Sequence, residues 1–193
     1  MLAYLFWHRP FTRVNRKLYE EVLMRFQSDL IAVKPAGVVG AASFRIEPVH
    51  WLDGLSGYED WYLLDGSWAI DSLNAFAIAG HMQEPHDKVA ALMEHGHGGL
   101  YAHVGGETAL SEQSTIYWLT RPRSIQWRAA MDPFRAQYPQ ANIWRRQMVL
   151  GPAAEFGVEM PGDEELEAPS RWEFHRVRRT RLPKLIASNA TVS

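Results

Sequence analysis

The chain contains one aromatic stretch twice, and this repetition constrains its fold more than any other feature. Residues Tyr4–Pro10 form a run of aromatic and aliphatic side chains that ends at an Arg-Pro pair and leads into a helical pattern. Residues Ile116–Pro122 repeat this arrangement, and the two Arg-Pro pairs lie 112 positions apart. Two similar strand-to-helix transitions at this distance predict a tandem duplication of one α+β unit.

The first half alternates between strand-like and helix-like patterns. Residues Ala3–Arg9 favour a strand that is apolar on both faces, as central strands are. An amphipathic helix should follow and end near Pro35, and its expected apolar positions are Val14, Leu18, Val22, Phe26 and Leu30. The next predicted elements are a hairpin of strands 37–51 and 58–65, a helix capped by Ser67, a helix starting at Pro85, a turn at Gly96–Gly99 and a closing strand at Leu100–Val104. This β-α-β-β-α-β order is that of a ferredoxin-like unit.

The second half repeats the order but loses one helix. The predicted elements are a strand at Thr115–Thr120, a helix at Ile125–Tyr138, strands at Ala141–Leu150 and Glu155–Met160, and a last strand at Arg171–Val177. The acidic segment 161–170 contains prolines and has no apolar stripe, so it cannot supply a full second helix. The predicted organisation is a first repeat at 1–106, a linker at 107–114, a truncated second repeat at 115–185 and a loose tail at 186–193.

This element order, together with the repeated aromatic Arg-Pro stretch, resembles the dimeric α+β barrel superfamily in its tandem-repeat form. The resemblance implies an α+β fold in which two tandem ferredoxin-like βαββαβ repeats pack their antiparallel sheets as a pseudo-dimeric barrel. The superfamily includes small monooxygenases, isomerase-like and dehalogenase-like enzymes, stress-responsive barrels and haem proteins. No diagnostic catalytic motif of these groups is matched.

Charge and composition exclude several classes of function. The formal charge of −2 gives no global basic bias, so nucleic acid is not an expected partner. The absence of cysteine removes disulfides and thiolate chemistry and agrees with a cytoplasmic location. The apolar stretch at the start is short and carries His8 and Arg9, so we expect a strand there rather than a signal peptide or membrane span. A homo-oligomer is compatible with such a barrel.

The first candidate site joins His8 and Arg9 at the end of the first strand with His50 and Trp51 at the end of the second. Histidine could act as a general base and arginine could hold an anionic ligand. The alternative is a boundary histidine with a satisfied ring beside an arginine that caps the strand. Aligning the Arg-Pro pairs sets Thr120 against His8, which indicates that the histidine was added to one copy only.

The second candidate is Asp60, which the sequence places inside an apolar strand. Alternation puts Tyr58, Asp60 and Tyr62 on one face. A carboxylate facing a barrel interior must be paired or shifted in pKa, which is the usual setting for acid-base work. Asp60 is therefore a candidate base, and a salt bridge to an arginine such as Arg146 is the alternative. Trp118, Arg121 and Arg146 complete the residues expected to contact a ligand.

Neither a metal nor a cofactor is predicted. The cluster His81, His86 and Asp87 lacks the His-x-x-x-His spacing of a helical metal site. Haem is a weaker alternative, because the second copy offers only His175 as an axial ligand. The arginines between Arg145 and Arg181 are expected to pair with neighbouring acids such as Glu155 and Glu159 rather than to bind phosphate.

The eight tryptophans favour an aromatic core and can also line a pocket for an apolar ligand. The leading prediction is a small-molecule enzyme that uses His8, His50 or Asp60 for acid-base chemistry in an aromatic-lined pocket, in a monooxygenase-, isomerase- or cyclase-like reaction. The alternatives are a non-catalytic binding protein for an apolar or haem-like ligand and a structural assembly module.

Overall fold

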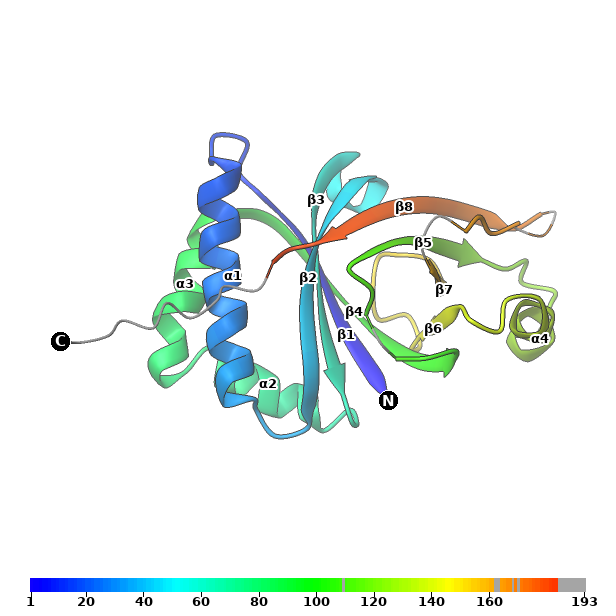
Figure 1. Ribbon diagram of the computed structural model, residues 1–193, viewed down its shortest axis with the longest axis horizontal. Helices are drawn as coiled ribbons and strands as arrows, with labels where there is room; N and C mark the ends of the chain where they lie inside the picture. Colours follow the sequence, from blue (N-terminus) through cyan, green and yellow to red (C-terminus); the bar gives the residue numbers. More distant parts are fainter. Residues whose placement is uncertain (109, 162–163, 168, 170, 184–193) are drawn as a thin grey trace.

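The structure, a computed structural model, describes residues 1–108, 110–161, 164–167, 169 and 171–183 (Figure 1). The strands are β1 (Leu2–Pro10), β2 (Val38–Val49), β3 (Leu55–Leu64), β4 (Met93–Gly105), β5 (Gln113–Thr120), β6 (Asn142–Arg146), β7 (Phe156–Pro161) and β8 (Glu173–Arg181). The helices are α1 (Arg16–Val33), α2 (Ala69–Ala77), α3 (Gln83–Leu92) and α4 (Trp127–Gln137), with short 3₁₀ turns η1 (His50–Leu52) and η2 (Gly80–Met82). Within these described ranges, no helix is long and apolar enough to cross a membrane.

The strands close into one antiparallel barrel in the order β1-β3-β2-β8-β5-β7-β6-β4. Read from β4, the first half runs β4-β1-β3-β2 and the second half runs β8-β5-β7-β6, so each half has the same internal strand order. Helices α1, α2 and α3 cover the outer face of the first-half strands, and α4 lies at the other end beside β6 (Figure 1). The predicted α+β fold with an antiparallel barrel is confirmed.

Aromatic side chains fill the barrel interior. The side chains of Trp7, Trp61, Trp118 and Trp144 are all fully buried. The rings of Trp7 and Trp118 meet edge to face at 5.5 Å, as do those of Trp61 and Trp144 at 5.1 Å. The barrel interior around these rings is therefore packed core and not a ligand pocket. The prediction that the tryptophans form an aromatic core is confirmed for these four.

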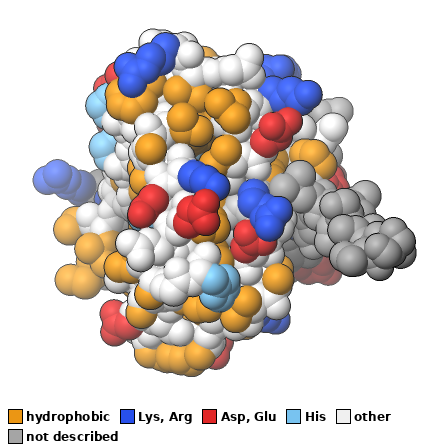
Figure 2. Space-filling model, turned by 90° about the vertical axis from the view of Figure 1, so that its left-hand side faces the viewer, with side chains coloured by type: hydrophobic (Ala, Val, Ile, Leu, Met, Phe, Trp, Pro, Cys, Tyr) orange, Lys and Arg blue, Asp and Glu red, His pale blue; other side chains and the backbone are white. Residues whose placement is uncertain are grey.

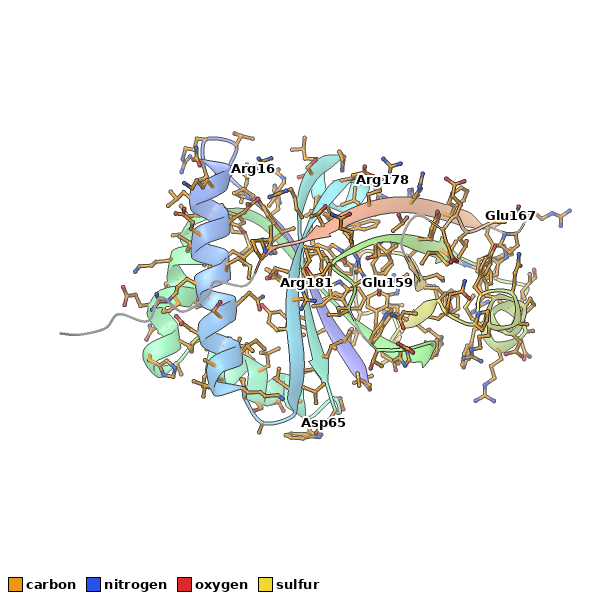
Figure 3. The ribbon with its side chains drawn as sticks, viewed as in Figure 1. Arg16, Asp65, Glu159, Glu167, Arg178 and Arg181 are labelled. Atoms are coloured by element: carbon orange, nitrogen blue, oxygen red, sulfur yellow. The ribbon has the colours of Figure 1, made fainter. Side chains whose placement is uncertain are left out.

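A charged cluster is also enclosed by the barrel, and the sequence did not reveal it as a unit. The guanidinium of Arg179 lies 3.1 Å from Glu59 and 2.5 Å from Glu159, and it donates to Ser114 Oγ at 2.7 Å. Glu59 also accepts the indole N–H groups of Trp7 and Trp61 at 2.6 and 2.5 Å. Figure 3 shows Glu159 among the side chains within the barrel. These bonds tie β8 to β3, β5 and β7.

The side chains of the two copies face the barrel in a register that differs by one residue from the alignment of their Arg-Pro pairs. Leu5 and Trp7 point into the barrel in β1, whereas Trp118 does so in β5 and Leu119 packs toward α4. Trp118 thus matches Trp7 rather than Phe6, because a shift of one residue moves a strand side chain to the opposite face. Alternation puts Thr120 on the inward face of β5, whereas His8 is on the outward face of β1, so the comparison of His8 with Thr120 was wrong.

The buried stripe of α1 also differs from the prediction. Leu18 is 47% exposed, and the buried face carries Tyr19, Leu23, Phe26 and Leu30. Four residues advance a helix by about 40° more than one full turn, so a strict four-residue spacing drifts off the core face. The helix starts at Arg16 because the side chain of the preceding asparagine accepts the N–H groups of Lys17 and Leu18.

Several predicted boundaries in residues 66–183 are wrong. Ser67 does not cap α2, and the neighbouring Trp68 is 56% exposed rather than buried. Gly96–Gly99 is part of β4 and not a turn, because β1 pairs along the whole glycine stretch. A Cβ at Gly96 would lie 2.5 Å from the Phe6 ring, so the glycine leaves room for an aromatic side chain.

In the second half, β6 ends at Arg146, before the predicted Leu150. The last strand extends to Arg181. The predicted linker is shorter than expected, since β5 already begins at Gln113. No helix occurs in the described residues between β7 and β8. The predicted tail lies outside the described residues.

Gly57 offers a test of this packing. A Cβ at Gly57 would lie 2.5 Å from the backbone oxygen of His8, which cannot move without displacing β1. We expect Gly57→Ala to lower the free energy of unfolding by about 1–3 kcal/mol, measured by urea denaturation. Gly40→Ala is the matched control, because its Cβ would meet only Leu63 at an ordinary 3.6 Å. Equal stability of the two variants would contradict the packing.

Candidate functional site

A cavity of about 390 Å³ lies between the outer face of the first-half sheet and helices α1, α2 and α3. Its walls are mostly aliphatic and aromatic, with Leu23, Phe26 and Leu30 from α1 and Leu73 from α2. The volume is within the range of small-molecule sites, which are concave and largely apolar with a few polar groups. The cavity is thus outside the barrel, and it is built entirely from the first half of the chain.

The floor of the cavity comes from β1 and β3. Alternation along β1 turns Tyr4, Phe6 and His8 outward, and β3 contributes Asp60 and Tyr62. The sequence prediction that Asp60 faces the barrel interior was wrong, since that face belongs to Glu59 and its neighbours. Pairing of Phe6 with Asp60 brings His8 Nε2 to 3.2 Å from Asp60 Oδ2. The structure therefore unites residues that the sequence offered as separate candidates.

Tyr19 holds the His8 ring through a hydrogen bond. Its hydroxyl lies 2.6 Å from His8 Nδ1, and both residues are almost completely buried. Burial and the negative charge of Asp60 raise the pKa of Tyr19 far above its usual range, so the hydroxyl stays protonated. We assign the O–H as the donor to Nδ1, which leaves the ring N–H at Nε2, facing Asp60. Nδ1 is then occupied by Tyr19, whereas Nε2 lies 3.2 Å from Asp60 Oδ2 in a geometry that gives no hydrogen bond.

A second chain of hydrogen bonds reaches the same carboxylate oxygen. The Gln27 amide donates to the Tyr62 hydroxyl at 2.8 Å, and that hydroxyl lies 3.4 Å from Asp60 Oδ2. Burial and Asp60 raise the pKa of Tyr62, so this hydroxyl also remains a donor. Asp60 Oδ1, in contrast, has no hydrogen-bond partner among the described residues. Tyr62 is therefore the hydrogen-bond donor to Asp60, at Oδ2, and Oδ1 is a buried acceptor without a partner among the described residues.

Tyr58 supports the histidine from behind. Its ring stacks on the His8 ring at 5.6 Å with an interplanar angle of 17°. Its hydroxyl donates to Glu20 at 3.0 Å, and Glu20 in turn pairs with Arg45 at 2.7 Å. Burial and the Glu20 charge raise the pKa of Tyr58. Tyr58 thus holds His8 in place and is not among the residues that line the cavity.

The other residues of the first candidate site lie elsewhere. Arg9 is bonded to Asp53 and Glu94, so it is not free to hold an anionic ligand. The His50 ring lies in η1, 4.7 Å from the ring of His175. Burial and that neighbouring ring lower the pKa of His50. Trp51 belongs to the barrel core, and the structure does not bring either η1 residue to the cavity.

The second-half candidates also have other partners. Trp118 is part of the barrel core. Arg121 forms an ion pair with Glu155 at 3.1 Å, and Arg146 donates to the carbonyl groups of Gly151 and Ala153 at 3.0 and 2.6 Å. Asp60 therefore has no salt bridge to Arg146. The predicted pairing of the arginines between Arg145 and Arg181 with nearby acids is confirmed for Arg179, which binds Glu159, and for Arg145, which lies 3.9 Å from Glu155.

Sequence reasoning missed Tyr19 and Gln27 on α1, and all of the α2 and α3 wall. The spacing of Tyr19, Leu23, Phe26 and Leu30 follows the true helical period and was the available signal for this face. For α2 and α3, the sequence pattern indicated buried apolar residues such as Leu73 and Val89, but not that they would line a cavity.

In the described part of the chain, no group of three or more acidic or histidine side chains could hold a metal ion. The two cavity histidines and His175 already have other neighbours. His8 Nδ1 is bonded to Tyr19 and its Nε2 lies 3.2 Å from Asp60, and His86 Nδ1 lies 3.0 Å from Asp87. His175 is exposed on β8, and its ring is packed against that of His50.

No protein-family model and no curated protein matches the sequence. Among solved structures, the fold is similar to that of an anthrone oxidase-like protein, with a TM-score of 0.52, 10% identity and coverage of 94% of this chain and 91% of that chain. A Lactobacillus acidophilus NCFM protein provisionally assigned as a monooxygenase gives a TM-score of 0.46, 11% identity and coverage of 82% and 75%. At this identity, the first likeness shows the fold alone.

Proposed function

We propose that the protein is a small-molecule enzyme that binds an apolar, ring-containing substrate in the cavity and removes a proton from it with Asp60. The observation that carries this proposal is the buried Asp60 carboxylate at the floor of an apolar cavity, with Tyr62 hydrogen-bonded to Oδ2, His8 Nε2 3.2 Å from Oδ2, and Oδ1 without a partner among the described residues. Such placement is typical of acid-base residues.

In the proposed step, a proton passes from an acidic C–H of the substrate to Asp60 Oδ1, and the electron pair of that bond stays on the substrate as an enolate. The stacked rings of Phe6 and His8, 5.3 Å apart, offer a flat apolar surface for the substrate ring. Oxygenation, isomerisation and cyclisation can each proceed from such a carbanion. The name of the anthrone oxidase-like protein favours oxygenation, for which molecular oxygen would be the co-substrate.

We also infer that the two halves descend from one duplicated ferredoxin-like unit, with boundaries near 1–106 and 115–185. Support comes from the shared strand order and from the matching positions of Trp7 and Trp118. On the outward face of β5, the second copy has Leu119 in an apolar cluster with Met131 and Phe134 of α4. Duplication thus explains why one copy carries the site and the other contributes packing.

Deuterium exchange tests the proposed function without knowledge of the final product. The protein is incubated in D₂O with a panel of uncharged aromatic ketones, and deuterium in the recovered compounds is measured by mass spectrometry. We expect enzyme-dependent exchange at the carbon next to the carbonyl for at least one compound. His50→Ala should retain this rate within about twofold, because His50 lies outside the cavity.

A non-catalytic binding protein for an apolar ligand is the second candidate, because most of the cavity wall is aliphatic or aromatic. Tight binding of a compound without any acceleration of exchange across the panel would contradict the enzyme and favour this candidate. A purely structural module is disfavoured by the presence of the cavity itself.

A further inference from the structure

The charges around the cavity are of one sign. Asp60 lies at its floor and Asp71, from the first turn of α2, is exposed at its edge. None of the described residues that line it is a lysine or arginine. His8 is occupied by its partners, and His86 has Asp87 beside it at 3.0 Å. A ligand therefore meets carboxylates and no permanent cation.

The cations near this part of the fold are already paired with acids. Arg25 lies 2.9 Å from Asp29, Lys88 lies 2.7 Å from Glu84, and Arg45 is held by Glu20. The surface of the helical face carries charges of both signs (Figure 2), so the lack of basic residues is a property of the cavity and not of its surroundings.

One local feature would attract an anion, namely the positive end of the α2 dipole. Asp71 stands in the first turn of this helix, where a carboxylate offsets the positive end of the dipole. A carboxylate on the ligand would thus face Asp71 at the edge and Asp60 inside, and like charges in an apolar setting disfavour each other strongly. A hydroxyl or ammonium group can instead donate to the free Oδ1 of Asp60.

From these observations we propose that the cavity accepts uncharged or cationic ring compounds with a hydrogen-bond-donating head group and rejects carboxylates of the same shape. Asp71 is the specificity-determining residue at the edge. This inference takes its site from the proposed function and adds the charge class of the substrate. It concerns binding alone and does not depend on the proton-transfer step.

Three probes of matched shape test the proposal: 1-naphthalenemethanol, 1-naphthylmethylamine and 1-naphthoate. Dissociation constants are measured by calorimetry at about pH 8, above the usual pKa of an imidazole. We expect the alcohol and the amine to bind at least about tenfold more tightly than the carboxylate. Asp71→Asn should narrow this ratio, whereas Asp87→Asn, outside the cavity lining, should leave it unchanged.

Equal or tighter binding of 1-naphthoate, an unchanged ratio in Asp71→Asn, or no binding of any probe would each overturn the inference. The two proposals fail separately. Charge-selective binding without deuterium exchange would support the charge selectivity of the cavity and contradict the proposed enzyme. Deuterium exchange without charge selectivity would support the enzyme and contradict the charge selectivity.

Discussion

Asp60→Asn is expected to reduce turnover by about 10²–10⁴-fold, the usual contribution of a positioned general base. Asparagine has the shape of aspartate, and its amide oxygen can still accept the Tyr62 hydrogen bond, but the NH₂ group that then replaces Asp60 Oδ1 cannot take up a proton. The fold should therefore survive while proton removal stops. The rate of deuterium exchange into the best substrate of the ketone panel measures this effect.

Asp65→Asn is the matched control, since Asp65 lies exposed just beyond the end of β3 (Figure 3). It should leave the exchange rate within about twofold of the wild type. If Asp60→Asn is folded by circular dichroism and keeps more than about a tenth of the wild-type rate, another group is the base.

Arg179→Met should be the most destabilising substitution of a single side chain in the barrel. It leaves Glu59 and Glu159 buried without their shared cation, and removing one partner of a buried ion pair costs about 3–5 kcal/mol. Urea denaturation measures the loss. Arg178→Met on the same strand is the control, because Arg178 is exposed and its loss should change stability by less than about 0.5 kcal/mol. Similar stabilities of the two variants would refute a structural role for the cluster.

The same cluster predicts a dependence of stability on pH. Burial alone would raise the pKa of Glu159, but the charge and hydrogen bonds of Arg179 outweigh it and hold this pKa below the ordinary value of 4.5. A carboxyl with a lower pKa in the folded state contributes stability above its unfolded pKa, and this contribution is lost as pH falls through the folded pKa. The free energy of unfolding of the wild type should therefore decrease below about pH 4.5. Arg179→Met should not show this decrease, because the cation that lowers the pKa of Glu159 is gone.

Local patterns predicted most elements of the fold, because strand alternation and helical period report directly on burial. They failed where pairing across the chain decides the structure. The glycines of β4 look like a turn in sequence, yet they form a strand because β1 pairs with them and its aromatic side chains fill the space above. The phase between the two copies was likewise invisible, since an Arg-Pro pair marks the end of a strand and not the direction of its side chains.

Single residues of the candidate site could be predicted from the sequence, but not which of them lie together. His8 and Asp60 stood out as polar residues in apolar strands, but their meeting depends on the register between β1 and β3. Arg179 resembled one more surface arginine, because its burial depends on the closure of the barrel by β8. Residues such as Tyr19, which act through His8, became apparent only once the helix was placed on the sheet.

The central claim is that substrate binds outside the barrel, against Asp60. The most direct test is a crystal structure with 6-bromo-2-naphthol, whose bromine is located by anomalous scattering. We expect the bromine between α1 and α2 near Phe26 and Leu73, with the ligand hydroxyl within about 3 Å of Asp60 Oδ1. A ligand seated beside His50 and Trp51 with the cavity empty would contradict it.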